Sequence, residues 1–263
     1  MTSRPLAMAP QDAADRARFE SELQRILAAG QEAHVAMRVL GSLAFQLHCP
    51  KYGYLQEKLG RAYTDIDFAA YGREASGVRA LMAGLGYSDN REVYVVSEGA
   101  RAIFDNAKLG LHVDVFYDRL DFSHVISWAG RLEVDRPTIP LAEMFLEKMQ
   151  IFRINEKDII DTIMLVLEHP FGASDSETIN MAHICRLCAS DWGLWRTVTM
   201  NLQKVAQLAS GYAQLEAGNK TRVAAQVQAA LAAIEAEPKT MAWRLRSRVG
   251  DRVKWYKDVD EVE

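Results

Sequence analysis

Residues 64–71 read TDIDFAAY, and they place two acids, Asp65 and Asp67, inside what otherwise has the pattern of a buried strand. Apolar residues alternate with the acids, which is the period-two signature of a β-strand. Residues i and i+2 of a strand share a face, so the two carboxylates lie roughly 7 Å apart on one side of the sheet. Like charges at this spacing raise each other's pKa, and a bound cation relieves them.

A third acid extends this pattern. Asp114 lies in LHVDVFY, residues 111–117, again between apolar residues of an expected strand. Three carboxylates on neighbouring strands offer the hard oxygen ligands that Mg²⁺ prefers, and they make a two-metal phosphoryl-transfer site a reasonable prediction. The alternative is structural, because an isolated D-x-D arises by chance and an acid on an edge strand guards against aggregation.

Gly41 and Ser42 follow the apolar run HVAMRVL, at the expected change from strand to helix. Glycine permits close backbone approach, and a helix N-terminus offers N–H groups and the positive end of a dipole to a phosphate. The Ser42 hydroxyl adds a donor. A strand followed by GS and a helix is common, so this feature gains weight only from the acids that come after it.

In the order VLGS, then DID, then VDV, the sequence resembles the nucleotidyltransferase superfamily with the DNA polymerase β-type fold. The resemblance implies an α+β fold, two Mg²⁺ ions and a nucleoside triphosphate (NTP) substrate such as ATP. It implies that Asp65 and Asp67 hold both metals and that Asp114 completes the metal that lowers the acceptor's pKa. Gly41 and Ser42 would bind the β- and γ-phosphates.

The segment LAEMFLEKMQIFRINEKDIIDTIML, residues 141–165, extends the resemblance to the AbiEii/MenT-type nucleotidyltransferases. The resemblance implies that Lys148 contacts the triphosphate, and that Asp158 and Asp161 hold the lysine in place or contact substrate. For Asp158 a structural explanation is equally open, because an acid near a helix N-terminus is favoured by the helix dipole.

The 22 residues between Ser42 and Asp65 exceed what is usual in minimal members of the superfamily. We interpret residues 49–63, CPKYGYLQEKLGRAY, as a loop over the active site, since they hold a proline, two glycines and several charges. In this interpretation the loop brings Arg61 near the phosphates or the acceptor.

The order of elements predicts an α+β chain with two domains. We expect a catalytic domain at 1–139 and a helical domain at 140–263 that completes the nucleotide site. Apolar periodicity predicts helices at 12–30, 43–49 and 74–87, strands at 34–40, 65–71, 91–98, 100–107 and 111–118, and helices at 140–154, 156–169, 176–189, 191–209, 219–236 and 241–259.

Composition narrows the class of protein. The chain has 263 residues, a net charge of −4 and 49% hydrophobic residues, which is typical of a globular protein able to bury a core. No run of 18 apolar residues occurs, so we expect no membrane partner. The polar N-terminus and three scattered cysteines indicate no secretory signal and a reducing cytoplasm.

The acceptor is left open by the sequence. The AbiEii/MenT resemblance implies a toxin-like role on tRNA or a protein, with a cognate antitoxin as a further partner. Six basic residues and three aromatic residues in 241–257 fit an RNA backbone, although a solvated helix face paired with acids of the same chain explains them as well. Transfer to a small antibiotic-like molecule, or nucleotide binding without turnover, are the alternatives.

Overall fold

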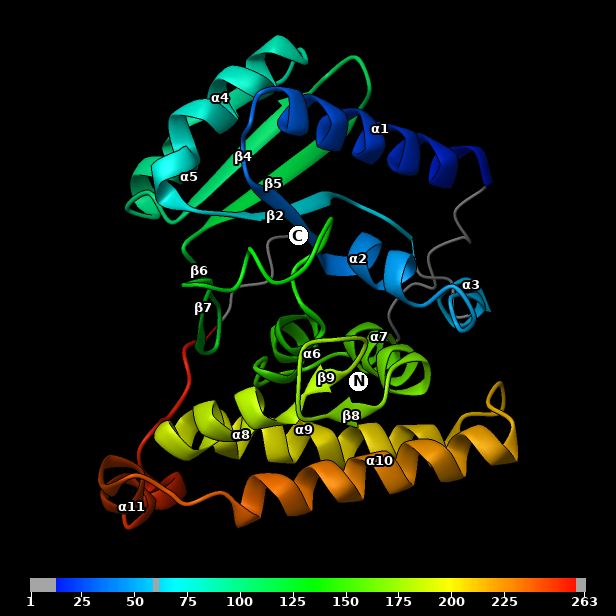
Figure 1. Ribbon diagram of the computed structural model, residues 1–263, viewed down its shortest axis with the longest axis vertical. Coiled ribbons are helices and arrows are strands. Elements are labelled where there is room, and N and C mark those ends of the chain that lie inside the picture. Colours follow the sequence, from blue (N-terminus) through cyan, green and yellow to red (C-terminus); the bar gives the residue numbers. More distant parts are fainter. Residues whose placement is uncertain (1–12, 59–61, 259–263) are drawn as a thin grey trace, which may run out of the picture. The chain divides into compact units, whose positions relative to one another are not determined.

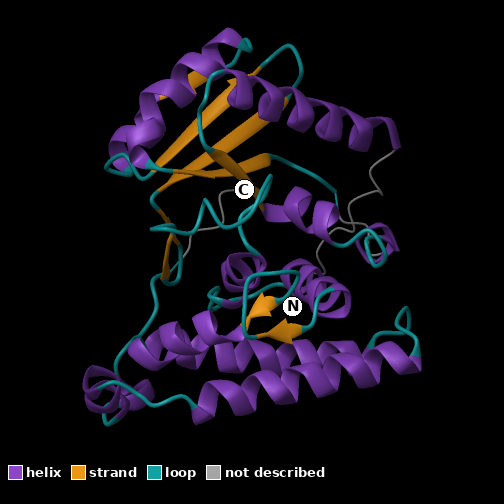
Figure 2. Ribbon diagram, in the orientation of Figure 1, coloured by secondary structure: helices purple, strands orange, loops and turns teal. Residues whose placement is uncertain are grey.

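The computed structural model describes residues 13–58 and 62–258, and these residues fall into two compact units that meet in the chain between Asp118 and Arg119 (Figure 1). The first unit mixes helices and strands, and the second is mostly helical (Figure 2). The compact units divide after Asp118, whereas the sequence predicts a domain boundary after residue 139. The functional division into a catalytic and a helical domain stays a prediction.

Within the described residues, the first unit has one mixed sheet of five strands in the order β1-β2-β5-β4-β3. Strands β2 and β5 are parallel, and the other neighbours are antiparallel. The strands are β1 (Met37–Leu40), β2 (Ile66–Ala70), β3 (Ser88–Asn90), β4 (Arg101–Asn106) and β5 (Leu111–Tyr117). This α+β architecture agrees with the class that the sequence predicts.

The two faces of the sheet differ in character. Val39, Phe68, Val113, Val115 and Phe104 share one face through the strand register, and all are buried. Helices α1 (Ala13–Glu32) and α4 (Ala75–Gly84) lie across one side of the sheet in Figure 1 and supply further buried apolar side chains. The opposite face carries the charged residues, because period-two alternation sends them away from the apolar set.

Two predictions of local structure in this unit are wrong. Residues 91–98 form helix α5 (Arg91–Val96), not a strand, because the short β3 already pairs with the edge of β4. Val95 and Val96 are left exposed there, so their strand propensity is overridden by context. The expected loop at 49–63 contains the short helix α3 (Tyr54–Lys58). The unit is completed by α2 (Gly41–His48) and a 3₁₀ turn, η1 (Gly72–Glu74).

The second unit packs six α-helices of the described chain, and α9 lies along α10 (Figure 1). Two small pairs of strands, which the sequence analysis does not predict, accompany the helices. The helices are α6 (Leu141–Met149), α7 (Glu156–Glu168), α8 (Met181–Ser190), α9 (Trp192–Gly211), α10 (Ala217–Ala236) and α11 (Met241–Ser247), the strands β6 (Arg119–Asp121), β7 (Val125–Ser127), β8 (Phe171–Gly172) and β9 (Ile179–Asn180), and the 3₁₀ turn η2 (Gly250–Arg252).

The final helix is shorter than predicted. It ends at Ser247, and Gly250 has a φ of +59° that a continuous helix does not allow. The Arg246 guanidinium stabilises the turn by donating to the backbone oxygens of Gly250 and Val253, at 2.8 and 2.7 Å. Among the residues that the structure describes, no helix has the length and apolar character needed to cross a membrane.

Candidate active site

Asp67 and Asp114 are direct register partners on the parallel strands β2 and β5. Partners in register point to the same face of a sheet, so both carboxylates lie on the face opposite the apolar core. Asp114 is buried, with 7% of its surface exposed, and Asp67 is half-buried. Asp65 stands just before β2 and accepts a 3.0 Å hydrogen bond from the Thr64 hydroxyl. The first unit therefore brings the predicted acids together.

Gly41 lies directly against this pair of strands. It begins α2, and its φ of +70° makes the sharp change of direction from β1 into the helix. A Cβ atom at this position would lie 2.1 Å from Oδ2 of Asp67, which is well inside contact distance. Only glycine fits both the backbone angle and the space beside the carboxylate. The N-cap is Leu40, whose side chain cannot accept a capping hydrogen bond, and Ser42 is buried in the first turn.

Arg101, which the sequence analysis missed, binds Asp114 with its whole guanidinium edge. Its Nε donates to Oδ1 and Oδ2 of Asp114 at 2.9 and 3.1 Å, and Nη2 also contacts Oδ2. Strand β4 places Arg101 opposite Phe116, two residues from Asp114 on the same face. The sequence predicts both strands, at 100–107 and 111–118, but only the observed register, in which Arg101 pairs with Phe116, puts the arginine beside the third acid.

Charges and burial shift the pKa values of this pair. Burial raises the pKa of the Asp114 carboxyl, and Asp65 adds to the rise, while the hydrogen bonds from Arg101 oppose it. The pKa of Arg101 is raised by its hydrogen bonds to Asp114 and then by the negative charges of Asp67 and Asp65. The three acids and Arg101 thus form one electrostatic group.

The donor set suits a hard divalent cation in its chemistry. Its members are carboxylates, two of them in register on adjacent strands, and the absent side chain at Gly41 leaves room for Asp67. However, in the residues 13–58 and 62–258 no three His, Cys, Asp or Glu side chains are placed to share one ion. The described residues therefore do not form a preassembled metal site, and Arg101 already contacts both oxygens of Asp114.

Lys148, Asp158 and Asp161 are brought together in the second unit. Lys148 is buried on α6, and its Nζ lies 3.1 Å from Oδ1 of Asp158, 3.4 Å from Oδ2 of Asp161 and 3.5 Å from Oε1 of Glu147. Asp161 is fully buried on α7. The two aspartates therefore fix the lysine, and a role for any of the three toward a triphosphate stays a prediction.

A pocket opens beside this cluster. It has a volume of about 670 Å³ and includes Asp158 in its wall. The ring of Phe152 stacks on that of Tyr256 with centroids 3.5 Å apart, and both rings line the same pocket. The cluster around Lys148 thus borders a space large enough for a small molecule. Arg61 lies outside the described residues, so its expected position near the phosphates stays a prediction.

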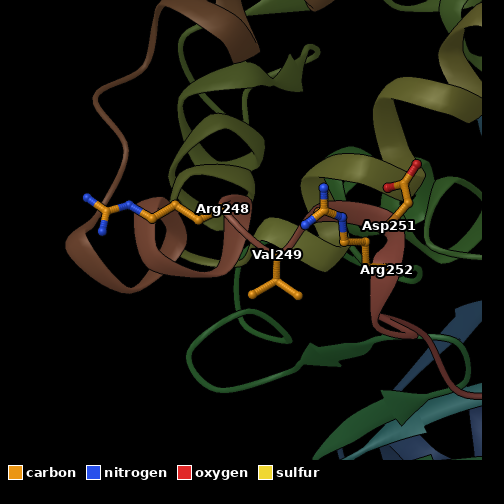
Figure 3. A pocket seen from close by; sticks show the side chains of 5 residues that line it. Arg248, Val249, Asp251 and Arg252 are labelled. Atoms are coloured by element: carbon orange, nitrogen blue, oxygen red, sulfur yellow. The ribbon is translucent and has the colours of Figure 1, made fainter.

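The basic C-terminal segment is only partly available to a polyanion. Arg246 is engaged by the turn, Lys257 pairs with Asp121 at 2.5 Å, and Lys254 pairs with Asp258. Arg248 and Arg252 are exposed and line a shallow hollow at the turn after α11, which Figure 3 shows with Val249 and Asp251. Pairing with acids of the same chain thus accounts for part of this charge.

No protein-family model, no curated protein and no solved structure matches this chain.

Proposed function

We propose that the chain is a Mg²⁺-dependent nucleotidyltransferase, which moves a nucleoside monophosphate from an NTP to an acceptor and releases pyrophosphate. The observation that carries the proposal is the pairing of Asp67 with Asp114 in register, beside a glycine turn that leaves no space for a side chain. Paired carboxylates on strands beside the first turn of a helix are an arrangement suited to binding a cation and a phosphate together.

The position of each candidate residue supports a specific role in the proposed transfer. Asp65, Asp67 and Asp114 would hold Mg²⁺, which when bound supplies charge neutralisation for the phosphates and lowers the pKa of the acceptor hydroxyl. Asp114 would also take the acceptor's proton. Gly41 and Ser42 begin a helix whose N-terminal dipole favours the phosphate charge. The resemblance adds Lys148 as a contact of the triphosphate.

A labelling experiment identifies the acceptor. The protein is incubated with each α-labelled NTP, Mg²⁺ and either total tRNA, a protein extract or a small-metabolite extract. We expect label on one of these pools. Label on RNA or protein supports the toxin-like role, and label on a small molecule supports the antibiotic-type alternative. If labelled NTP binds with Mg²⁺ but no pyrophosphate appears with any pool, the chain binds nucleotide without turnover.

Variants connect the activity to the site. Asp67→Asn and Asp114→Asn each remove one carboxylate charge, and we expect a loss of transfer of at least about a hundredfold. Asp105→Asn is the matched control, because Asp105 lies on the same face of the sheet but is more exposed and pairs with His112. Full transfer by the double variant of Asp67 and Asp114 would show that the site is wrongly assigned.

A further inference from the structure

Arg101 and Asp114 form an ion pair in which the guanidinium contacts both oxygens of the carboxylate. Both oxygens of the Asp114 carboxylate accept from the guanidinium, with Nε to Oδ1 at 2.9 Å and a second contact from Nη2 to Oδ2. Such two-point pairs are stronger and more directional than single hydrogen bonds between charged groups. Arg101 is therefore held in one position by Asp114.

The surroundings hold the guanidinium in the same place. Its carbon lies 5.3 Å from the centroid of the Phe116 ring, which is a contact between a cation and the face of an aromatic ring. The backbone of Arg101 pairs with that of Phe116 across β4 and β5. The guanidinium of Arg101 therefore contacts the apolar ring of Phe116 and, two residues along β5, the carboxylate of Asp114.

The same carboxylate oxygens are those that the proposed function gives to the divalent cation. The guanidinium contacts Oδ1 once and Oδ2 twice, so it uses about three of the roughly four lone-pair positions of the Asp114 carboxylate and leaves a cation no way to bind both oxygens. The charges of Asp65 and Asp67 act on Arg101 as well, so the single positive charge of the guanidinium offsets part of the charge of the acidic group. A cation that uses both oxygens of Asp114 can therefore bind only after the guanidinium has moved away.

We propose that Arg101 is an internal counter-ion which competes with the divalent cation for Asp114, so that the cation binds only when the guanidinium leaves the carboxylate. The inference rests on the proposed function and names a residue that regulates its site. Because the cation binds only the fraction of molecules in which Asp114 is released, its apparent affinity is lowered by that fraction. Arg101 is a positioning residue here, and it need not touch the reacting atoms.

The test is direct binding of Mn²⁺ alone to the full chain without NTP, followed by electron paramagnetic resonance of the unbound ion. We expect Arg101→Gln to bind Mn²⁺ about tenfold or more tightly than the unchanged protein. Arg101→Lys should fall between them, because an ammonium cannot form the two-point pair. Asp114→Asn added to Arg101→Gln should remove the gain. Circular dichroism establishes that each variant is folded, and Arg101→Lys keeps the test open if Arg101→Gln is not.

Arg91→Gln is the matched control for net charge. Arg91 belongs to the same unit but is exposed and pairs loosely with Asp89, at 3.5 Å, so its loss should leave Mn²⁺ binding unchanged. Equal Mn²⁺ affinity in the unchanged protein, Arg101→Gln and Arg101→Lys would overturn the competition, as would an equal gain in Arg91→Gln. Label transfer by the unchanged protein tests the proposed function separately. The proposed function fails if no label is transferred, even where the Mn²⁺ affinities differ.

Discussion

A methyl group added at Gly41 would stand 2.1 Å from Oδ2 of Asp67, so the turn into α2 and the carboxylate share one space. Gly41→Ala must therefore push Asp67 out of place, and it also forces alanine into a φ of +70°. The left-handed conformation alone costs about 1–2 kcal/mol. We expect a lower free energy of unfolding in urea and a loss of label transfer of at least about tenfold, since the carboxylate is displaced.

Gly84→Ala is the control for this prediction. Gly84 ends α4, and a Cβ atom there meets no other atom within 4 Å. Alanine at such a helical position should leave transfer unchanged and raise the free energy of unfolding by about 0.5–1 kcal/mol. If Gly41→Ala transferred label at the full rate, the close approach to Asp67 would have no part in the activity.

Period-two alternation was enough to predict that Asp67 and Asp114 each lie on a strand, and that Asp65 and Asp67 share one face. It could not show that the two strands are adjacent and parallel, because strand order depends on contacts far apart in the sequence. Arg101 was missed for the same reason. Its neighbour is known only when the register of β4 on β5 is known, and a shift of one residue would send it to the core face.

Residues 91–98 show the limit of local preference. Four of them are Val or Tyr, which favour strands, but the open edge of β4 is taken by Ser88–Asn90.

The Lys148 cluster could be predicted in part, since helical spacing puts Asp158 and Asp161 on one face of α7. The partner that each carboxylate selects depends on how α6 packs on α7, and local patterns do not contain this.

Arg131 holds together a buried ionic network in the second unit. Its Nε contacts Oε1 of Glu143 at 2.5 Å, and Nη2 contacts Oδ1 of Asp175 at 2.7 Å, while His183 lies 3.0 Å from the fully buried Glu143. Arg131→Met leaves Glu143 buried without its main partner. We expect the free energy of unfolding to fall by about 3–5 kcal/mol.

Chemical denaturation followed by circular dichroism measures this change. Arg222→Gln, an exposed substitution on α10, is the control and should change the free energy of unfolding by less than about 0.5 kcal/mol. A similar small effect of Arg131→Met would mean that water reaches Glu143 and that the network does not stabilise the unit.

His124 should make stability depend on pH. It is buried, its Nε2 lies 2.8 Å from the Thr197 hydroxyl, and burial lowers its pKa while Asp191 opposes the shift. The unfolded chain binds a proton near the ordinary value of about 6.5, but the folded chain does not until lower pH. Between these values the unfolded state holds more protons, so stability falls as pH falls below about 6.5.

Thermal unfolding at pH 7.5 and pH 5.5 tests this sign. We expect a lower Tm at pH 5.5, with part of the difference lost in His124→Gln, which does not titrate. His112→Gln is the control, because His112 is exposed on the other unit. An unchanged pH dependence in His124→Gln would assign the loss of stability to other groups.

Lys148 combines a structural and a proposed functional role, and the two can be separated. Lys148→Met leaves Asp158 and the fully buried Asp161 without the cation that lies 3.1 and 3.4 Å from them. We expect a fall of about 3 kcal/mol or more in the free energy of unfolding.

Lys148→Met with Asp161→Asn removes one charge of each sign, so it should recover part of this stability. If Lys148 also binds the triphosphate, the double variant regains stability but its transfer stays low, with a raised KM for NTP. If its role is only structural, transfer returns together with stability. Lys108→Met, at an exposed turn, should leave both unchanged.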